Sequence, residues 1–207
     1  MSIFKKIIVS GFSSLILVGA ANAAYIDFGN SAFTGARNQD SFTATVEGIR
    51  VQVEALEPSW AVLAQNSNGL GINSGLFDGT QSEIGGSLFT EVLEVEFLSG
   101  PVTLSQINVA NLYSTELWFG EIGVYNANDQ RVQFTGSSNG NNSIDVSIAN
   151  VSRITFSTRY DLYSDFNLKG LEVSASSAEQ VPEPGMISLL GFGVLAFSGV
   201  SFFRRKK

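Results

Sequence analysis

The sequence predicts an all-β protein, and three observations support that prediction. Short runs alternate apolar and polar residues with a period of two, as residues 49–54 (IRVQVE) do. Clusters of Asn, Gly, Asp and Ser separate these runs, for example at 66–69 and 136–142. No stretch of residues 24–175 shows the 3.6-residue period of a long amphipathic helix. Half-buried strands joined by polar turns produce such patterns. We therefore expect about ten short strands in one jelly-roll-like β-sandwich domain.

The expected strands can be placed one by one along the chain. The clearest alternation covers 49–54, 93–97 and 144–148, and shorter runs lie around 122–124, 132–134, 154–156 and 166–168. Further turn signals are the Asp-Gly pair at 78–79, the Ser-Gly-Pro at 99–101 and the Asn-Ala-Asn-Asp at 126–129. The glycine-rich interval from Gln65 to Thr90 predicts a long loop or a pair of irregular edge strands.

The N-terminus has the three parts of a secretory signal peptide. Lys5 and Lys6 supply the positive start, residues 7–20 are uncharged and apolar, and Ala21-Asn22-Ala23 forms a small-x-small cleavage site. A retained membrane helix is the alternative, but its apolar core is short and a cleavage site follows it directly. We therefore expect removal of residues 1–23 and a mature chain that begins at Ala24.

A second apolar run, residues 185–203, lies near the C-terminus and is followed by Arg-Arg-Lys-Lys at 204–207. A helix over this run would be roughly 28 Å long at about 1.5 Å per residue, which is close to the thickness of a bilayer core. The basic residues favour a cytoplasmic end, which leaves the body on the outer side of the membrane. Four glycines and three serines make the run a weak anchor. A buried core helix is the alternative, which this terminal position disfavours.

The order of Pro182-Glu183-Pro184, an apolar helix and a basic cluster resembles the PEP-CTERM protein-sorting domain of Gram-negative bacteria. The resemblance covers residues 182–207, and residues 176–181 read as a linker to it. It implies that an inner-membrane cysteine protease, exosortase, recognises the motif. It also implies a transient anchor in the inner membrane, followed by a location at the cell surface or with secreted exopolysaccharide. Residues 69–174 loosely resemble the β-sandwich bodies that precede such tails, which supports the fold only.

The composition excludes several classes of function. Six basic and eighteen acidic residues lie between Ala24 and Val181, so the mature body has a net charge of −12. That charge argues against nucleic acid and anionic membrane surfaces as partners. The chain has no Cys and no His. It therefore lacks disulfides, the usual zinc, copper and haem ligands, and the Ser-His-Asp and Cys-His nucleophiles. We expect no cofactor, apart from a structural calcium ion considered below.

Carboxylates are the remaining acid–base groups. Glu91, Glu94 and Glu96 share one expected strand, and Glu94 and Glu96 should project from the same face about 7 Å apart. Glycosidases use carboxylate pairs at comparable spacings. Two acids on the polar side of an amphipathic strand are also what a solvated face contains. We expect a protein that is not an enzyme, with a carboxylate-based glycan hydrolase or lyase as the alternative.

Two loop segments contain oxygen ligands that calcium could use. Asp78 and Glu83 lie in one segment, and Asp161 and Asp165 lie in the other. Jelly-roll domains often hold calcium with carboxylates and loop carbonyls. Neither segment matches the twelve-residue calcium loop, and Asp-Gly by itself is a good turn.

Aromatic residues suggest a site for carbohydrate. Sugars stack their apolar faces on exposed Trp and Tyr rings, and the candidates are Trp118, Tyr113, Tyr160 and Tyr163. Burial in the core is the alternative, because one residue of the adjacent pair Trp118 and Phe119 must point inward. We therefore predict an exported structural or binding protein, with polysaccharide as the favoured partner.

Overall fold

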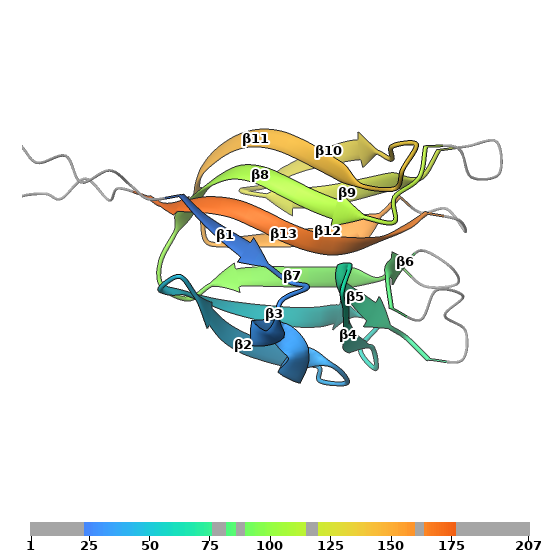
Figure 1. Ribbon diagram of the computed structural model, residues 1–207, viewed down its shortest axis with the longest axis horizontal. Helices are drawn as coiled ribbons and strands as arrows, with labels where there is room; N and C mark the ends of the chain where they lie inside the picture. Colours follow the sequence, from blue (N-terminus) through green and yellow to red (C-terminus); the bar gives the residue numbers. More distant parts are fainter. Residues whose placement is uncertain (1–22, 76–81, 86–89, 115–119, 160–163, 177–207) are drawn as a thin grey trace, which may run out of the picture.

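The computed structural model describes residues 23–75, 82–85, 90–114, 120–159 and 164–176. These residues form thirteen strands and one short 3-10 helix, and the strands make two antiparallel sheets (Figure 1). None of the helices in these ranges is long and apolar enough to cross a membrane. The signal peptide expected over 1–23, apart from Ala23, and the apolar run 185–203 lie outside the described residues.

The first sheet has seven strands. Its main path runs β11 (Asn142–Val151), β8 (Val102–Ala110), β13 (Asp165–Ala175), β5 (Gly69–Asn73) and β4 (Val62–Asn66). Two further strands, β1 (Ala23–Asp27) and β6 (Ile84–Gly85), pair with β13. β13 therefore has four partners and is the central strand of this sheet.

The second sheet has six strands in the order β10 (Gln130–Thr135), β9 (Ile122–Ala127), β12 (Arg153–Thr158), β7 (Val92–Phe97), β3 (Ile49–Glu57) and β2 (Ser41–Val46). The 3-10 helix η1 (Ser31–Ala36) connects β1 to β2. From β7 onward the chain changes sheet at every connection except the β9–β10 hairpin. This crossing pattern, with all pairs antiparallel, confirms the predicted β-sandwich.

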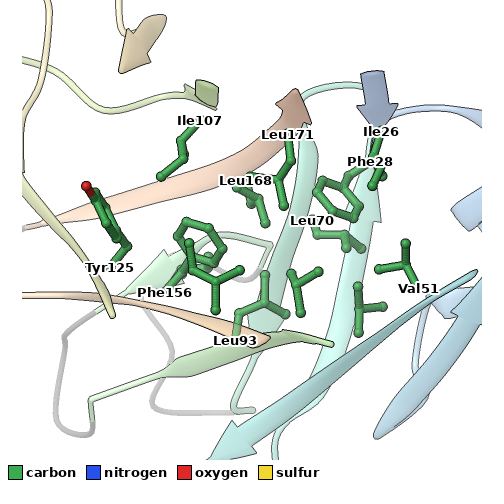
Figure 2. Close-up of a cluster of buried hydrophobic side chains, with 14 of the residues drawn as sticks. Ile26, Phe28, Val51, Leu70, Leu93, Ile107, Tyr125, Phe156, Leu168 and Leu171 are labelled. Atoms are coloured by element: carbon green, nitrogen blue, oxygen red, sulfur yellow. The ribbon is translucent and has the colours of Figure 1, made fainter. Parts of the chain in front are cut away.

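The core lies between the two sheets. β7 shows how it forms: Leu93, Val95 and Phe97 are buried while Glu94 and Glu96 alternate with them on the outer face. Figure 2 shows side chains from both sheets meeting in this layer, with the labelled residues Ile26, Phe28, Val51, Leu70, Leu93, Ile107, Tyr125, Phe156, Leu168 and Leu171. The hydrophobic effect on this apolar layer is the main force that holds the sheets together.

The strands expected from alternation are all present, but the glycine-rich interval differs from its prediction. β5 lies between β13 and β4 rather than at an edge, and its first four residues are buried. A Cβ atom at Gly69 would collide with the carbonyl oxygen of Leu168, and one at Gly71 with that of Ser82. The glycines therefore allow a close approach of neighbouring backbones, whereas their abundance suggested a loop.

The two ends of the sandwich differ, and we name them by what they carry. At one end, the tail pole, Ala23 pairs with Ser174, so β1 begins beside the end of β13 (Figure 1). The other end, the loop pole, is formed by residues that flank the undescribed segments: Ser74, Gly85, Glu91, Tyr113, Glu121 and Ser164. Hydrogen bonds join the strands there, including Ile122 N–H to Ser164 Oγ at 3.0 Å.

Candidate functional site

Two buried glutamates brace the loop pole. The Glu91 side chain follows segment 86–89, and its Oε2 accepts a hydrogen bond from the Gly85 N–H, with an N–O distance of 2.7 Å. Glu121 follows segment 115–119, and its Oε2 accepts from the Tyr113 N–H. Both residues are 2% exposed. A carboxylate that accepts from a backbone amide makes a strong hydrogen bond, so each glutamate fixes the two ends of one segment relative to each other.

Hydrogen bonds of two side-chain amides also hold the backbone in place near β6. Asn167 on β13 is fully buried, and its Nδ2 donates to the carbonyl oxygen of Ser82 at 2.6 Å. The Asn111 Nδ2 donates to the Asn167 Oδ1 at 2.9 Å and to the Glu83 Oε1 at 2.5 Å. These bonds tie residues 82–85 to the ends of β8 and β13. The residues that flank several undescribed segments are thus held by side chains as well as by the sheet ladders.

The predicted calcium and sugar residues fall at this same pole where the structure describes them. Tyr113 is half-buried and its ring lies against Gly140. Glu83 precedes β6, and Asp165 pairs with Gly85 at the start of β13. The other candidates, Asp78, Trp118, Tyr160, Asp161 and Tyr163, lie outside the described residues. Within the described ranges, no three Asp, Glu, His or Cys side chains are grouped so that they could hold a metal ion.

Sequence reasoning missed Trp60, which the structure places at the loop pole. Trp60 lies on the connection from β3 to β4 and is 58% exposed. Its Nε1–H donates to the carbonyl oxygen of Ser74, directly after β5, with an N–O distance of 3.1 Å. Trp60 was not among the aromatic candidates for a sugar site. Its exposure depends on the tertiary fold, although its position in a Pro-Ser-Trp turn was a usable signal.

The predicted carboxylate pair lies on the outer face of the six-stranded sheet. Arg153 on β12 contacts both acids, with its Nη1 3.8 Å from Glu94 Oε2 and its Nη2 3.5 Å from Glu96 Oε1. Glu54 on β3 is the register partner of Glu94. Glu91, expected on the same strand as this pair, instead precedes β7 and is buried at the loop pole. The two acids do share a face, as predicted, and one arginine bridges them.

The environment of Glu94 raises the pKa of its carboxyl group. Its side chain is 13% exposed, against 63% for Arg153. Burial raises the pKa of the Glu94 carboxyl above the ordinary value, the Arg153 guanidinium opposes this rise, and the negative charges of Glu96 and Glu54 add to it. A carboxyl that binds its proton more tightly could serve as an acid. The charge of Arg153, however, also stabilises both carboxylates as an ion cluster.

A polar hollow adjoins this ion cluster. It has a volume of about 480 Å³ and is lined by Asn126, Asn128, Asp129, Ser152, Arg153 and Thr155. Asn128 and Asp129 form the tight turn of the β9–β10 hairpin, where both have positive φ. Amide, hydroxyl and charged groups of this kind hydrogen-bond to hydroxyl-rich ligands. None of the described residues that line the hollow is aromatic, so they offer no flat apolar surface for a sugar ring to cover.

Comparison with known families identifies the C-terminal segment. Residues 180–206 match the family described as the PEP-CTERM protein-sorting motif. No curated protein matches the chain. The match confirms the resemblance of Pro182, Glu183 and Pro184 and the residues after them, all of which lie outside the described residues. The motif indicates an exported protein that is targeted to exosortase and anchored in a membrane before it is sorted to the cell surface.

Proposed function

We propose that this exosortase-targeted protein is a non-catalytic binding protein of the cell surface or extracellular matrix, and that it associates with polysaccharide through its loop pole. The observation that supports this most is the opposition of the two poles. The sorting motif begins a few residues after β13, which ends at the tail pole beside β1. A body attached by that end presents its loop pole away from the membrane.

The bracing of the loop pole supports binding. The Oε2 atoms of Glu91 and Glu121 and the side-chain amide of Asn167 are hydrogen-bonded to backbone groups that flank the undescribed segments. Hydrogen bonds from buried side chains hold the backbone around them in place. A rigid base reduces the conformational entropy that loops lose when a ligand binds. Most of the sequence-predicted sugar candidates lie in the segments that start and end here.

The test uses the protein purified from the producing bacterium. We expect the processed protein to sediment with the extracellular polysaccharide of the same strain, and to detach from cells of a strain that cannot synthesise that polysaccharide. Mass spectrometry of the C-terminus should find a chain that ends near Pro182 or Glu183. An intact Lys207, combined with no retention by polysaccharide, would contradict both parts of the proposal.

A glycan hydrolase or lyase is the second candidate, because the raised pKa of Glu94 suits an acid catalyst. The bridging of Glu94 and Glu96 by Arg153 favours the structural role instead. The double variant Glu94→Gln, Glu96→Gln separates the two. We expect neither the wild type nor the double variant to release reducing ends or unsaturated products from the polysaccharide. A measured activity that the double variant loses would establish the enzyme.

Structural calcium at Asp78 and Glu83 or at Asp161 and Asp165 also remains a proposal. Its support is the placement of Glu83 and Asp165 at the loop pole, near the ends of both segments. We expect calcium to raise the midpoint of thermal unfolding and EGTA to lower it again. Asp165→Asn should abolish that difference if the second segment holds the ion. An unfolding midpoint that does not respond to calcium would exclude a structural ion.

A further inference from the structure

We propose that Trp60 is a platform on which a pyranose ring of a neutral polysaccharide stacks. This inference rests on the proposed function and adds to it the residue that holds the sugar. Among the described residues, Trp60 is the most exposed of the large hydrophobic side chains, at 58%, against 41% for Tyr25 and 39% for Leu98. Tyr25 lies on β1, where its hydroxyl contacts Gly170, whereas Trp60 lies at the loop pole.

The hydrogen bond to the Ser74 carbonyl positions the Trp60 ring for stacking. The indole N–H is the side chain's one polar group, and the Ser74 carbonyl already accepts its hydrogen bond at 3.1 Å. Trp60 is 58% exposed, and because its N–H is hydrogen-bonded, the part of the side chain that faces solvent is apolar. The acceptor is itself well positioned, because Ser74 is 8% exposed and the next residue, Gly75, donates its N–H to Asn73 Oδ1. A ring held at its edge loses little freedom when a ligand covers it.

The surroundings favour a sugar over other occupants. Glu57 and Ser59 are exposed and lie within three residues of Trp60 in the chain, so hydrogen-bonding groups accompany the apolar surface. A pyranose has the matching character, with an apolar C–H face and a rim of hydroxyl groups. The net charge of −12 on the mature body repels anionic lipid and acidic polysaccharide. A neutral glycan is the class of ligand that fits both the ring and the charge.

The experiment exploits the fact that the chain has two tryptophans, Trp60 and Trp118. In the Trp118→Phe variant of the full mature protein, Trp60 is the only indole fluorophore. We expect addition of the strain's own polysaccharide, or of neutral oligosaccharides cut from it, to protect Trp60 from quenching by acrylamide. Trp60→Ala should weaken binding of the same oligosaccharides at least about tenfold. Trp60→Phe keeps an aromatic face but cannot donate to Ser74, so it should retain part of the affinity.

A matched control comes from Leu98, an exposed apolar side chain directly after β7. Leu98→Ala should bind as the wild type does, and circular dichroism should show that Trp60→Ala is folded under the conditions of the binding assay. Binding by Trp60→Ala at full affinity would overturn the platform while leaving the proposed function in place. If Trp60→Phe binds as weakly as Trp60→Ala, the platform is also refuted, since the indole would then act through its hydrogen bond alone.

If the wild type binds neither the polysaccharide nor the oligosaccharides, the proposed function and the platform are refuted together. Trp60-dependent binding to phosphatidylcholine vesicles, without binding to glycan, would assign the ring to membranes and overturn the proposal.

Discussion

At the scale of single residues, Glu121 shows what a buried carboxyl group can do in a small β-sandwich. Its carboxylate accepts from the Tyr113 N–H, although the side chain is 2% exposed. Removing the acceptor leaves a buried N–H without its partner, which costs about 1–3 kcal/mol. We expect Glu121→Ala to lower the free energy of unfolding by that amount, and Glu121→Gln, which keeps an oxygen acceptor, to lower it less. Urea unfolding measures both, and equal losses would contradict the bracing role.

The titration of Glu94 gives a prediction about pH. Burial raises the pKa of this carboxyl above 4.5, so the folded state favours the protonated form more than the unfolded state does. The contribution of Glu94 to the free energy of unfolding is therefore fully present below pH 4.5 and is lost as the pH rises through the raised pKa. Glu94→Gln stays uncharged at every pH. We expect it to be more stable than the wild type at pH 7, with a difference that shrinks toward pH 4.5.

Arg153→Gln provides the matched control for that experiment. The Arg153 guanidinium lowers the pKa of Glu94 and so offsets part of the rise. In the Arg153→Gln background, the gain from Glu94→Gln at pH 7 should therefore be larger. Unfolding in urea at several pH values measures each difference. A gain that does not change with pH, in either background, would show that Glu94 titrates alike in the folded and unfolded chains.

At the scale of elements, β1 contributes more to the core than its five residues suggest. Phe28, which directly follows it, is fully buried, and its ring meets the ring of Phe33 edge-to-face with centroids 4.9 Å apart. We expect Phe28→Ala to lower the free energy of unfolding by about 3–5 kcal/mol. Leu98→Ala is the control, since that side chain is 39% exposed and should change stability by about 0.5 kcal/mol or less. Urea unfolding compares the two, and similar losses would contradict this account.

Alternation identified the strands whose polar and apolar faces differ clearly, such as β3 and β7. It was uninformative for β5, whose two faces are both covered and whose glycines resemble a loop. β13 shows another limit. Lys169 is an extra residue between Leu168 and Gly170 in the pairing with β8, so the inward positions change from even to odd numbers along the strand. A bulge of this kind depends on the partner strand, which a local pattern does not reveal.

The candidate site was predictable in part for the same reason. Loop position and residue type placed Glu83, Tyr113 and Asp165 among the candidates, and all three lie at the loop pole. The exposure of Trp60 and the burial of Glu121 depend on contacts with residues that are distant in the chain or across the sandwich. Glu94 and Glu96 were placed on one face correctly, but the bridging Arg153 comes from a strand more than fifty residues later.

At the scale of the whole molecule, the body and its sorting tail should be independent in stability. The last described contacts are made by Ser176, whose N–H donates to the Pro101 carbonyl at 3.3 Å. A chain of residues 24–176 keeps every described contact of the mature body. We expect its free energy of unfolding to lie within about 0.5 kcal/mol of that of the processed protein from the host. A chain that ends at Lys169 should fail to fold, because it loses the buried Leu171 and Val173. Circular dichroism and urea unfolding test both.

The place of β13 in the sheet makes folding depend on a complete chain. β13 is the last strand of the described body, yet it joins β1, β5, β6 and β8. A chain that stalls or is cut before residue 165 leaves all four of these strands without their shared partner. Such a fragment lacks both the completed sheet and the sorting motif at residues 180–206. The intact motif therefore occurs only on chains that also contain β13, the strand that completes the sheet.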